Sequence, residues 1–183
     1  MSNYSDEELE IALYGLKRLM MFLGSVAVVA LIGFLMKNIQ GVFLFLLLFI
    51  PLRVFAGGLH LPTIWMCAIA SSALIILVAY ILNNAERLWI YESTYNIIIL
   101  VCALVIIALA PVETSTKPLF RGEKIRYKII STIITILEMG IFFISNGNDY
   151  IKMVVFLVIT VEAFYLIVQK GLNCMNGRMQ CIE

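Results

Sequence analysis

The chain has 183 residues, of which 62% are hydrophobic and 14% are charged, and its mean hydropathy is +1.00. A soluble core of that size cannot hide so many apolar side chains, so the composition excludes a soluble globular protein and predicts an integral membrane protein. The formal net charge of +1 identifies no charged partner. We expect contact with the lipid bilayer and none with nucleic acid.

Six apolar runs predict an all-α, polytopic membrane fold. The hydrocarbon core of a bilayer is about 30 Å thick, and a helix crosses it in roughly 20 residues. The predicted spans cover residues 19–36, 41–55, 62–82, 94–110, 129–144 and 151–168. The sequence contains no internal repeat and no low-complexity linker, so we expect residues 1–183 to form one domain.

The N-terminal segment predicts a helix that lies on the membrane surface. Ser5 and Glu8 have the spacing of a capping box, so a helix is expected to begin at Ser5. Leu9, Leu13 and Leu16 recur at helical intervals, which predicts an amphipathic, interfacial stretch before the first span. The acidic start of the chain is unlike the basic start of a cleavable signal peptide.

Glycines and prolines predict where several helices end or begin. Pro51 is expected to break the hydrogen-bond ladder near the end of the second span. Gly57 and Gly58 are expected to end that helix, since glycine adopts a positive φ at little cost. Pro62 suits the first turn of the next helix, and Gly171 is a predicted C-cap for the last span.

The distribution of basic residues predicts the orientation. Six spans place both termini on one side of the membrane, and residues 112–128 are expected to form a polar, basic loop on that same side. The terminal side holds Lys17, Arg18, Arg53, Lys117, Arg121, Lys124, Arg126, Lys128, Lys170 and Arg178, and the opposite side holds Lys37, Arg87 and Lys152. Ten against three predicts cytoplasmic termini, with residues 53–67 facing the cytoplasm as well.

The stretch RVFAGGLHLPTIWMC, residues 53–67, contains the one histidine of the chain and a cysteine seven residues later. We interpret His60 and Cys67 as a thiol-protease pair, because the thiolate is a nucleophile that needs a neighbouring base. On one straight helix the two side chains would share a face but lie about 10.5 Å apart. The glycines and Pro62 therefore predict that His60 sits on a non-helical turn and folds back over the new helix. Two ligands are too few for a metal site, and no cofactor is expected.

The same stretch resembles a known family. The family's pattern R-x3-GG-x-H-x2-T-x3-C is matched by Arg53, Gly57, Gly58, His60, Thr63 and Cys67. Pro111 and the sequence Lys117-Pro118-Leu119 resemble its second recognisable segment. With its length and six predicted spans, the chain resembles the accessory gene regulator B (AgrB) family over essentially its whole length.

That resemblance implies a multi-pass cysteine endopeptidase of the bacterial cell membrane that acts in quorum sensing. Its partner would be a short AgrD-like propeptide, whose C-terminal part is removed. The remainder would stay on the enzyme as a thioester and leave as a thiolactone or lactone macrocycle. Cys67 would be the nucleophile and His60 the general base and then acid. Arg53, Gly57, Gly58, Lys117 and Pro118 would shape the site or bind substrate.

Several alternatives stay open at the level of sequence. Glu138 and Glu162 lie within predicted spans and are candidates for a third catalytic group, or are buried acids paired between helices. The basic segment 117–128 could contact an acidic peptide or anionic lipid. A small transporter of a peptide or small molecule is the competing class of function. The chain could act alone or as a homodimer.

Overall fold

The computed structural model describes residues 6–57, 63–85, 92–112, 121–145, 147–175 and 177. These residues form six α-helices and no strand. The helices are α1 (Asp6–Leu35), α2 (Ile39–Ala56), α3 (Ile64–Asn83), α5 (Glu92–Leu109), α6 (Arg121–Ile144) and α7 (Asp149–Met175). The predicted all-α fold is confirmed.

Four of these helices contain segments long and apolar enough to cross a membrane: Ile39–Ala56, Trp65–Asn83, Gly122–Ile144 and Asp149–Met175. Two shorter apolar segments, Leu23–Leu35 and Thr94–Leu109, account for the other two predicted spans. Large apolar side chains are exposed on all six helices, as on Phe43, Leu104 and Ile136. Such surfaces suit contact with lipid, so the polytopic class is confirmed, with four full-length spans where six were expected.

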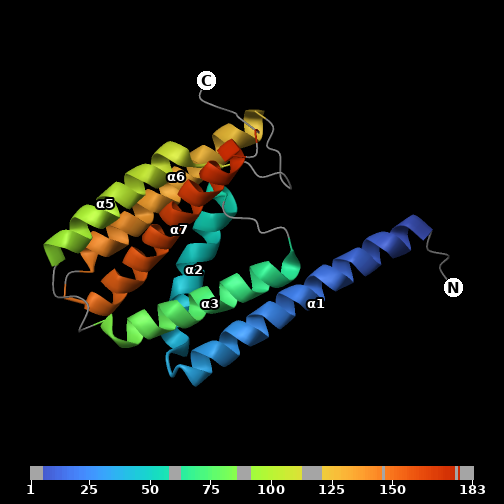
Figure 1. Cartoon of the computed structure of the whole chain (residues 1–183), viewed down its shortest axis with the longest axis horizontal. Helices are drawn as coiled ribbons and strands as arrows, with labels where there is room; N and C mark the ends of the chain where they lie inside the picture. The colour runs from blue at the N-terminus through green and yellow to red at the C-terminus, as the bar shows by residue number, and fades with distance from the viewer. Residues whose placement is uncertain are drawn as a thin grey trace.

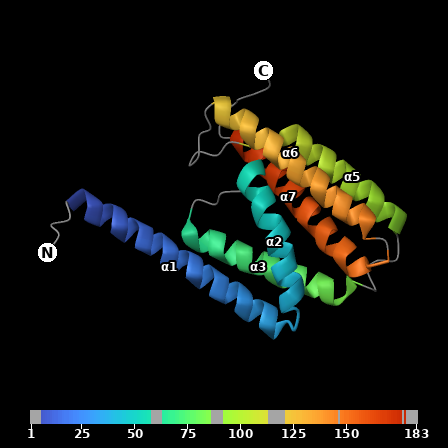
Figure 2. The same ribbon diagram turned by 180° about the vertical axis from the view of Figure 1, so that it is seen from behind.

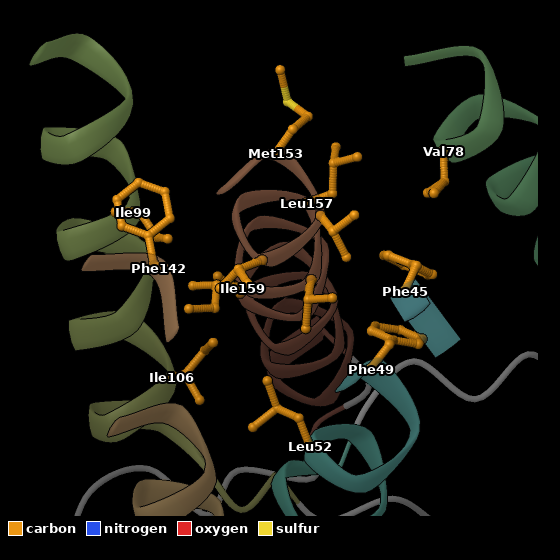
Figure 3. Packing of buried hydrophobic residues seen from close by; sticks show 14 of the residues in the cluster. Phe45, Phe49, Leu52, Val78, Ile99, Ile106, Phe142, Met153, Leu157 and Ile159 are labelled. Carbon is orange, nitrogen blue, oxygen red and sulfur yellow. The ribbon is translucent and has the colours of Figure 1, made fainter. Parts of the chain in front are cut away.

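Helix α7 is the centre of the fold. It packs against α2, α5 and α6, and 61% of its membrane-length apolar segment is buried inside the protein. Figure 3 shows Leu157 and Ile159 of α7 between Phe142 on one side and Phe45 and Phe49 of α2 on the other. The residues of α7 therefore hold fixed positions relative to α2, which carries Arg53.

Helices α1 and α3 form a pair on the far side of α2. They lie side by side in both views of the ribbon (Figure 1 and Figure 2), and α1 also contacts α2. The start of α3 diverges from the C-terminal ends of α2 and α7, whereas its end lies near the start of α7. The pair is thus close to the bundle at one end and separated from it at the other.

A polar junction joins the pair to the bundle at the close end. The Asn38 amide donates to the Asn83 oxygen at 2.7 Å, and the Asn83 amide donates to the Met36 carbonyl at 2.8 Å. The Tyr150 hydroxyl at the start of α7 donates to the Asn38 side-chain oxygen at 2.5 Å. A Cβ on Gly41 would lie 2.0 Å from that hydroxyl, so only glycine permits the contact.

The first two helices differ in detail from the prediction. Helix α1 runs without a break from Asp6 to Leu35, so the predicted interfacial stretch continues into the first span. Ser5 lies outside the described residues. Helix α2 runs through Pro51 to Ala56, in agreement with the predicted span 41–55, and Pro51 removes one N–H donor from the ladder without ending the helix. Phe49 and Leu52 on either side of Pro51 are buried, and this packing holds the helix despite the missing N–H group.

The last two helices are longer than predicted. Helix α6 begins at Arg121, so residues 121–128 of the predicted loop 112–128 are helical. There the Tyr127 ring packs edge-on against Phe55 of α2, with centroids 5.5 Å apart. Helix α7 continues past Gly171, which is therefore not a C-cap. The Gln169 amide donates to the Asn173 oxygen at 2.9 Å across that position and supports the extra turn.

Candidate functional site

The end of α2 is tied to the segment that follows α5. Gly57 ends the helix as predicted, with a φ of 87°, and its N–H donates to the Arg53 carbonyl at 3.2 Å. The Val112 N–H donates to the Ala56 carbonyl at 3.1 Å and makes an isolated parallel bridge. A Cβ on Gly57 would lie 2.5 Å from the Val112 oxygen, so the bridge needs glycine at this position.

Cys67 lies in the first turn of α3 and is exposed. Thr63 is the N-cap of this helix, and its hydroxyl accepts from the Met66 N–H at 3.3 Å. The Thr63 carbonyl accepts the Cys67 N–H at 3.1 Å. The threonine of the family pattern therefore begins the helix that carries the cysteine.

Arg53 lies on the last turn of α2 within a group of polar and aromatic side chains from α7. Its Nη1 atom is 3.8 Å from an oxygen of Glu162, which has no exposed surface. Its guanidinium carbon lies 4.6 Å from the Tyr165 ring centroid and 5.6 Å from that of Phe49. We call Arg53, Glu162, Tyr165 and Phe49 the arginine cluster.

The Cys67 thiol is exposed at the start of α3, where the helix pair diverges from the C-terminal ends of α2 and α7 (Figure 1).

The two acids that were candidates for a third catalytic group occupy different surroundings. Glu138 on α6 and Glu162 on α7 are both buried, and none of their oxygens accepts a hydrogen bond from a described residue. Glu162 has an ion pair with Arg53.

Several predicted site residues lie outside the described residues. These are Gly58, His60, Lys117 and Pro118. Their roles, including the pairing of His60 with Cys67, stay predictions. Among the described residues, no group of three or more His, Cys, Asp or Glu side chains could hold a metal ion.

Sequence reasoning missed Tyr165, Phe49 and Val112. Tyr165 follows Glu162 by three positions and Phe49 precedes Arg53 by four, so each shares a helix face with a residue already singled out. That spacing was a usable signal. No sequence signal indicates the bridge between Val112 and Gly57, because a single backbone bridge requires no particular sequence pattern.

The fold and the site define a class: a polytopic helical membrane protein with an exposed cysteine in the first turn of α3 and an ion pair between α2 and α7. The sequence profile of accessory gene regulator B matches residues 1–166. The chain belongs to the AgrB family, and its role lies in the agr quorum-sensing system. Searches of curated proteins and of solved structures gave no match.

Proposed function

We propose that the chain is a membrane-embedded cysteine endopeptidase that processes an AgrD-like propeptide to a cyclic autoinducing peptide. The position of Cys67 carries this proposal. Its exposed thiol lies in the first turn of a helix that Thr63 caps, at the cysteine position of the family pattern. Membership of the AgrB family supports the same substrate class.

In the first proposed step, the Cys67 thiolate attacks the carbonyl carbon of the scissile peptide bond. The C–N bond then breaks, His60 gives a proton to the leaving amine, and the acyl group stays on Cys67 as a thioester. His60 had taken this proton from the thiol, so the charges balance.

In the second step, a thiol or hydroxyl of the bound peptide attacks the thioester. The new bond closes the ring as a thiolactone or lactone, and the Cys67 thiol is released. A thiol exchange of this kind conserves the bond type, so the enzyme mainly needs to hold the peptide folded and exclude water. The apolar surroundings of α3 suit that requirement.

We propose the predicted topology for this reaction, with both termini and the site toward the cytoplasm. The propeptide would then reach Cys67 from the side on which it is made. Arg53, Gly57, Gly58, Lys117 and Pro118 would shape the site or bind the peptide.

Substitution of the two reacting residues tests the proposal. We expect Cys67→Ala and His60→Ala to abolish propeptide cleavage in vesicles while the protein stays inserted. Cys102→Ala, Cys174→Ala and Cys181→Ala are the matched controls and should retain most of the cleavage. Cleavage by Cys67→Ala would rule out the cysteine protease, and transport of an uncleaved peptide would favour the alternative class.

A further inference from the structure

We propose that the start of α6 is a binding site for an anionic phospholipid of the membrane. Arg126 and Lys128 hold the negatively charged headgroup, and the exposed isoleucines that begin at Ile125 contact an acyl chain. This inference goes beyond the proposed endopeptidase function and does not depend on it.

One side of α6 is apolar and faces away from the helix bundle. The buried residues of this helix mark its inward side: Ser131, Thr135, Glu138 and Phe142. The opposite side carries side chains that are each more than half exposed: Ile125, Ile129, Ile133 and Ile136. They recur every three or four residues, so they form a continuous strip along the helix, which we call the isoleucine row. In a bilayer this row contacts lipid chains.

Two basic side chains flank the first turn of the isoleucine row. Successive residues of an α-helix are about 100° apart around its axis. Arg126 therefore lies on one side of Ile125, and Lys128 lies on the other side of Ile129. Both basic side chains are exposed. Glu123, the acidic residue of the first turn, is about 200° from Ile125 and so lies across the helix from the row.

Gly122 leaves room for a headgroup at the end of the row. It lies three residues before Ile125, and no heavy atom lies within 4 Å of the position that a Cβ would occupy. The apolar segment Gly122–Ile144 has 23 residues, about 34 Å of helix against a hydrocarbon core of about 30 Å. With Ile144 at one boundary, the first turn reaches the opposite headgroup layer, to which the long side chains of Arg126 and Lys128 can extend.

A contact with α2 fixes the rotation of this part of α6. Tyr127 lies between the two basic residues in the sequence and is half-buried. Its ring packs edge-on against Phe55 of α2, with centroids 5.5 Å apart. Because Tyr127 is held inward, the isoleucine row and its flanking charges face outward together. The lipid-binding surface is therefore already formed in the folded protein.

The combination of charge and apolar surface selects the ligand. Arg126 and Lys128 require an anion, and the isoleucine row requires an apolar chain directly beside that anion. An anionic phospholipid has both parts in one molecule. An acidic peptide segment would complement the charges and leave the row without a partner.

A tryptophan reporter measures which lipid lies beside the row. Ile125→Trp is placed in a chain whose native tryptophans are replaced by phenylalanine, Trp65→Phe and Trp89→Phe, and is reconstituted in vesicles. Brominated phosphatidylglycerol and brominated phosphatidylcholine quench the reporter on contact, so together they give a relative affinity. We expect phosphatidylglycerol to be preferred. Arg126→Gln and Lys128→Gln should each lower the preference about fivefold, which corresponds to about 1 kcal/mol per basic residue.

Two controls separate a binding site from general attraction to a basic membrane face. Lys170 is an exposed residue near the end of α7, and that end lies beside the start of α6 (Figure 1). Lys170→Gln should leave the preference at the Ile125→Trp reporter unchanged. A second reporter, Ile144→Trp at the other end of α6, should show no preference. Equal effects of Lys170→Gln and Lys128→Gln, or equal preference at both reporters, would overturn the inference.

Thermal unfolding in detergent supplies a test without a reporter, because a ligand that binds the folded protein raises its unfolding temperature. Added phosphatidylglycerol should raise the Tm of the wild type more than that of the double variant Arg126→Gln/Lys128→Gln, and equal shifts would contradict the site. A soluble polyglutamate peptide should not displace brominated phosphatidylglycerol. Displacement would identify an acidic peptide as the ligand and overturn the assignment. None of these measurements uses cleavage, so their failure is distinct from a failure of the proposed function.

Discussion

Gly57 is the residue at which backbone geometry limits the site most directly. Its φ of 87° with a ψ of −168° is essentially restricted to glycine, and an added Cβ would lie 2.5 Å from the Val112 oxygen. We expect Gly57→Ala to destabilise the protein by about 1–3 kcal/mol and to reduce cleavage, because Arg53 lies one turn away. Thermal unfolding in detergent and vesicle assays of cleavage measure the two effects.

Gly171 provides the control for this substitution. It lies inside α7, and no heavy atom lies within 4 Å of the position that a Cβ would occupy. Gly171→Ala should stabilise the helix by about 0.5–1 kcal/mol. If Gly57→Ala behaves in the same way as Gly171→Ala, the bridge to Val112 does not constrain the end of α2.

At the residue scale, sequence predicted the components of the site better than their contacts. The end of the helix at Gly57 followed from the conformational freedom of glycine, and Arg53 was singled out because a cation at membrane depth needs a partner. That the partner is Glu162 depends on how α2 packs on α7. No local pattern distinguishes Glu162 from Glu138 in this respect.

At the scale of helices, the polar junction is the feature that can be tested alone. The Tyr150 hydroxyl donates to Asn38, and Asn38 also contacts Asn83. Tyr150→Phe removes one hydrogen bond and leaves the Asn38 oxygen without this donor, so we expect a loss of about 1 kcal/mol in unfolding free energy. Thermal unfolding in detergent measures the loss.

Tyr80→Phe is the matched control for this change. Tyr80 is 60% exposed, so removal of its hydroxyl should alter the unfolding temperature little. Equal effects of the two substitutions would mean that the junction does not stabilise the contact between α7 and the helix pair.

Helix boundaries were predicted where chain-breaking residues agree with packing. The end of α5 at Leu109 and the end of α6 at Ile144 lie within one residue of the ends of the predicted spans 94–110 and 129–144. The start of α6 and the end of α7 were not predicted. Their charged and polar residues indicated segments outside the spans, but such residues also form helix where a tertiary contact holds the helix in place. Tyr127 against Phe55 provides such an anchor, and it is invisible in a single sequence.

At the scale of the whole molecule, the orientation in the membrane is the central prediction. Positive charges gather on the side of the termini, so residues 113–120 should face the cytoplasm and the turn before α7 should face outward. In a variant without reactive native cysteines, an impermeant maleimide should label Thr116→Cys only from the cytoplasmic side. It should label Asn148→Cys only from outside.

The reverse labelling pattern would place the site on the wrong face for a cytosolic propeptide. Apolar runs were enough to predict a polytopic helical protein, and the pattern R-x3-GG-x-H-x2-T-x3-C indicated the family. They did not predict that α1 and α3 would pair apart from the other helices, because that arrangement depends on contacts between distant segments.

The polar junction and Cys67 lie at opposite ends of α3, so a small rotation of the helix at the junction displaces the thiol. Its 20 residues span about 30 Å, so a rotation of about 5° at the junction would move the thiol by roughly 2–3 Å. A misplacement of about 1 Å can cost a hundredfold in rate. The amide contacts around Asn38 and Asn83 therefore limit how far the start of α3, with Cys67, can move relative to α2 and α7.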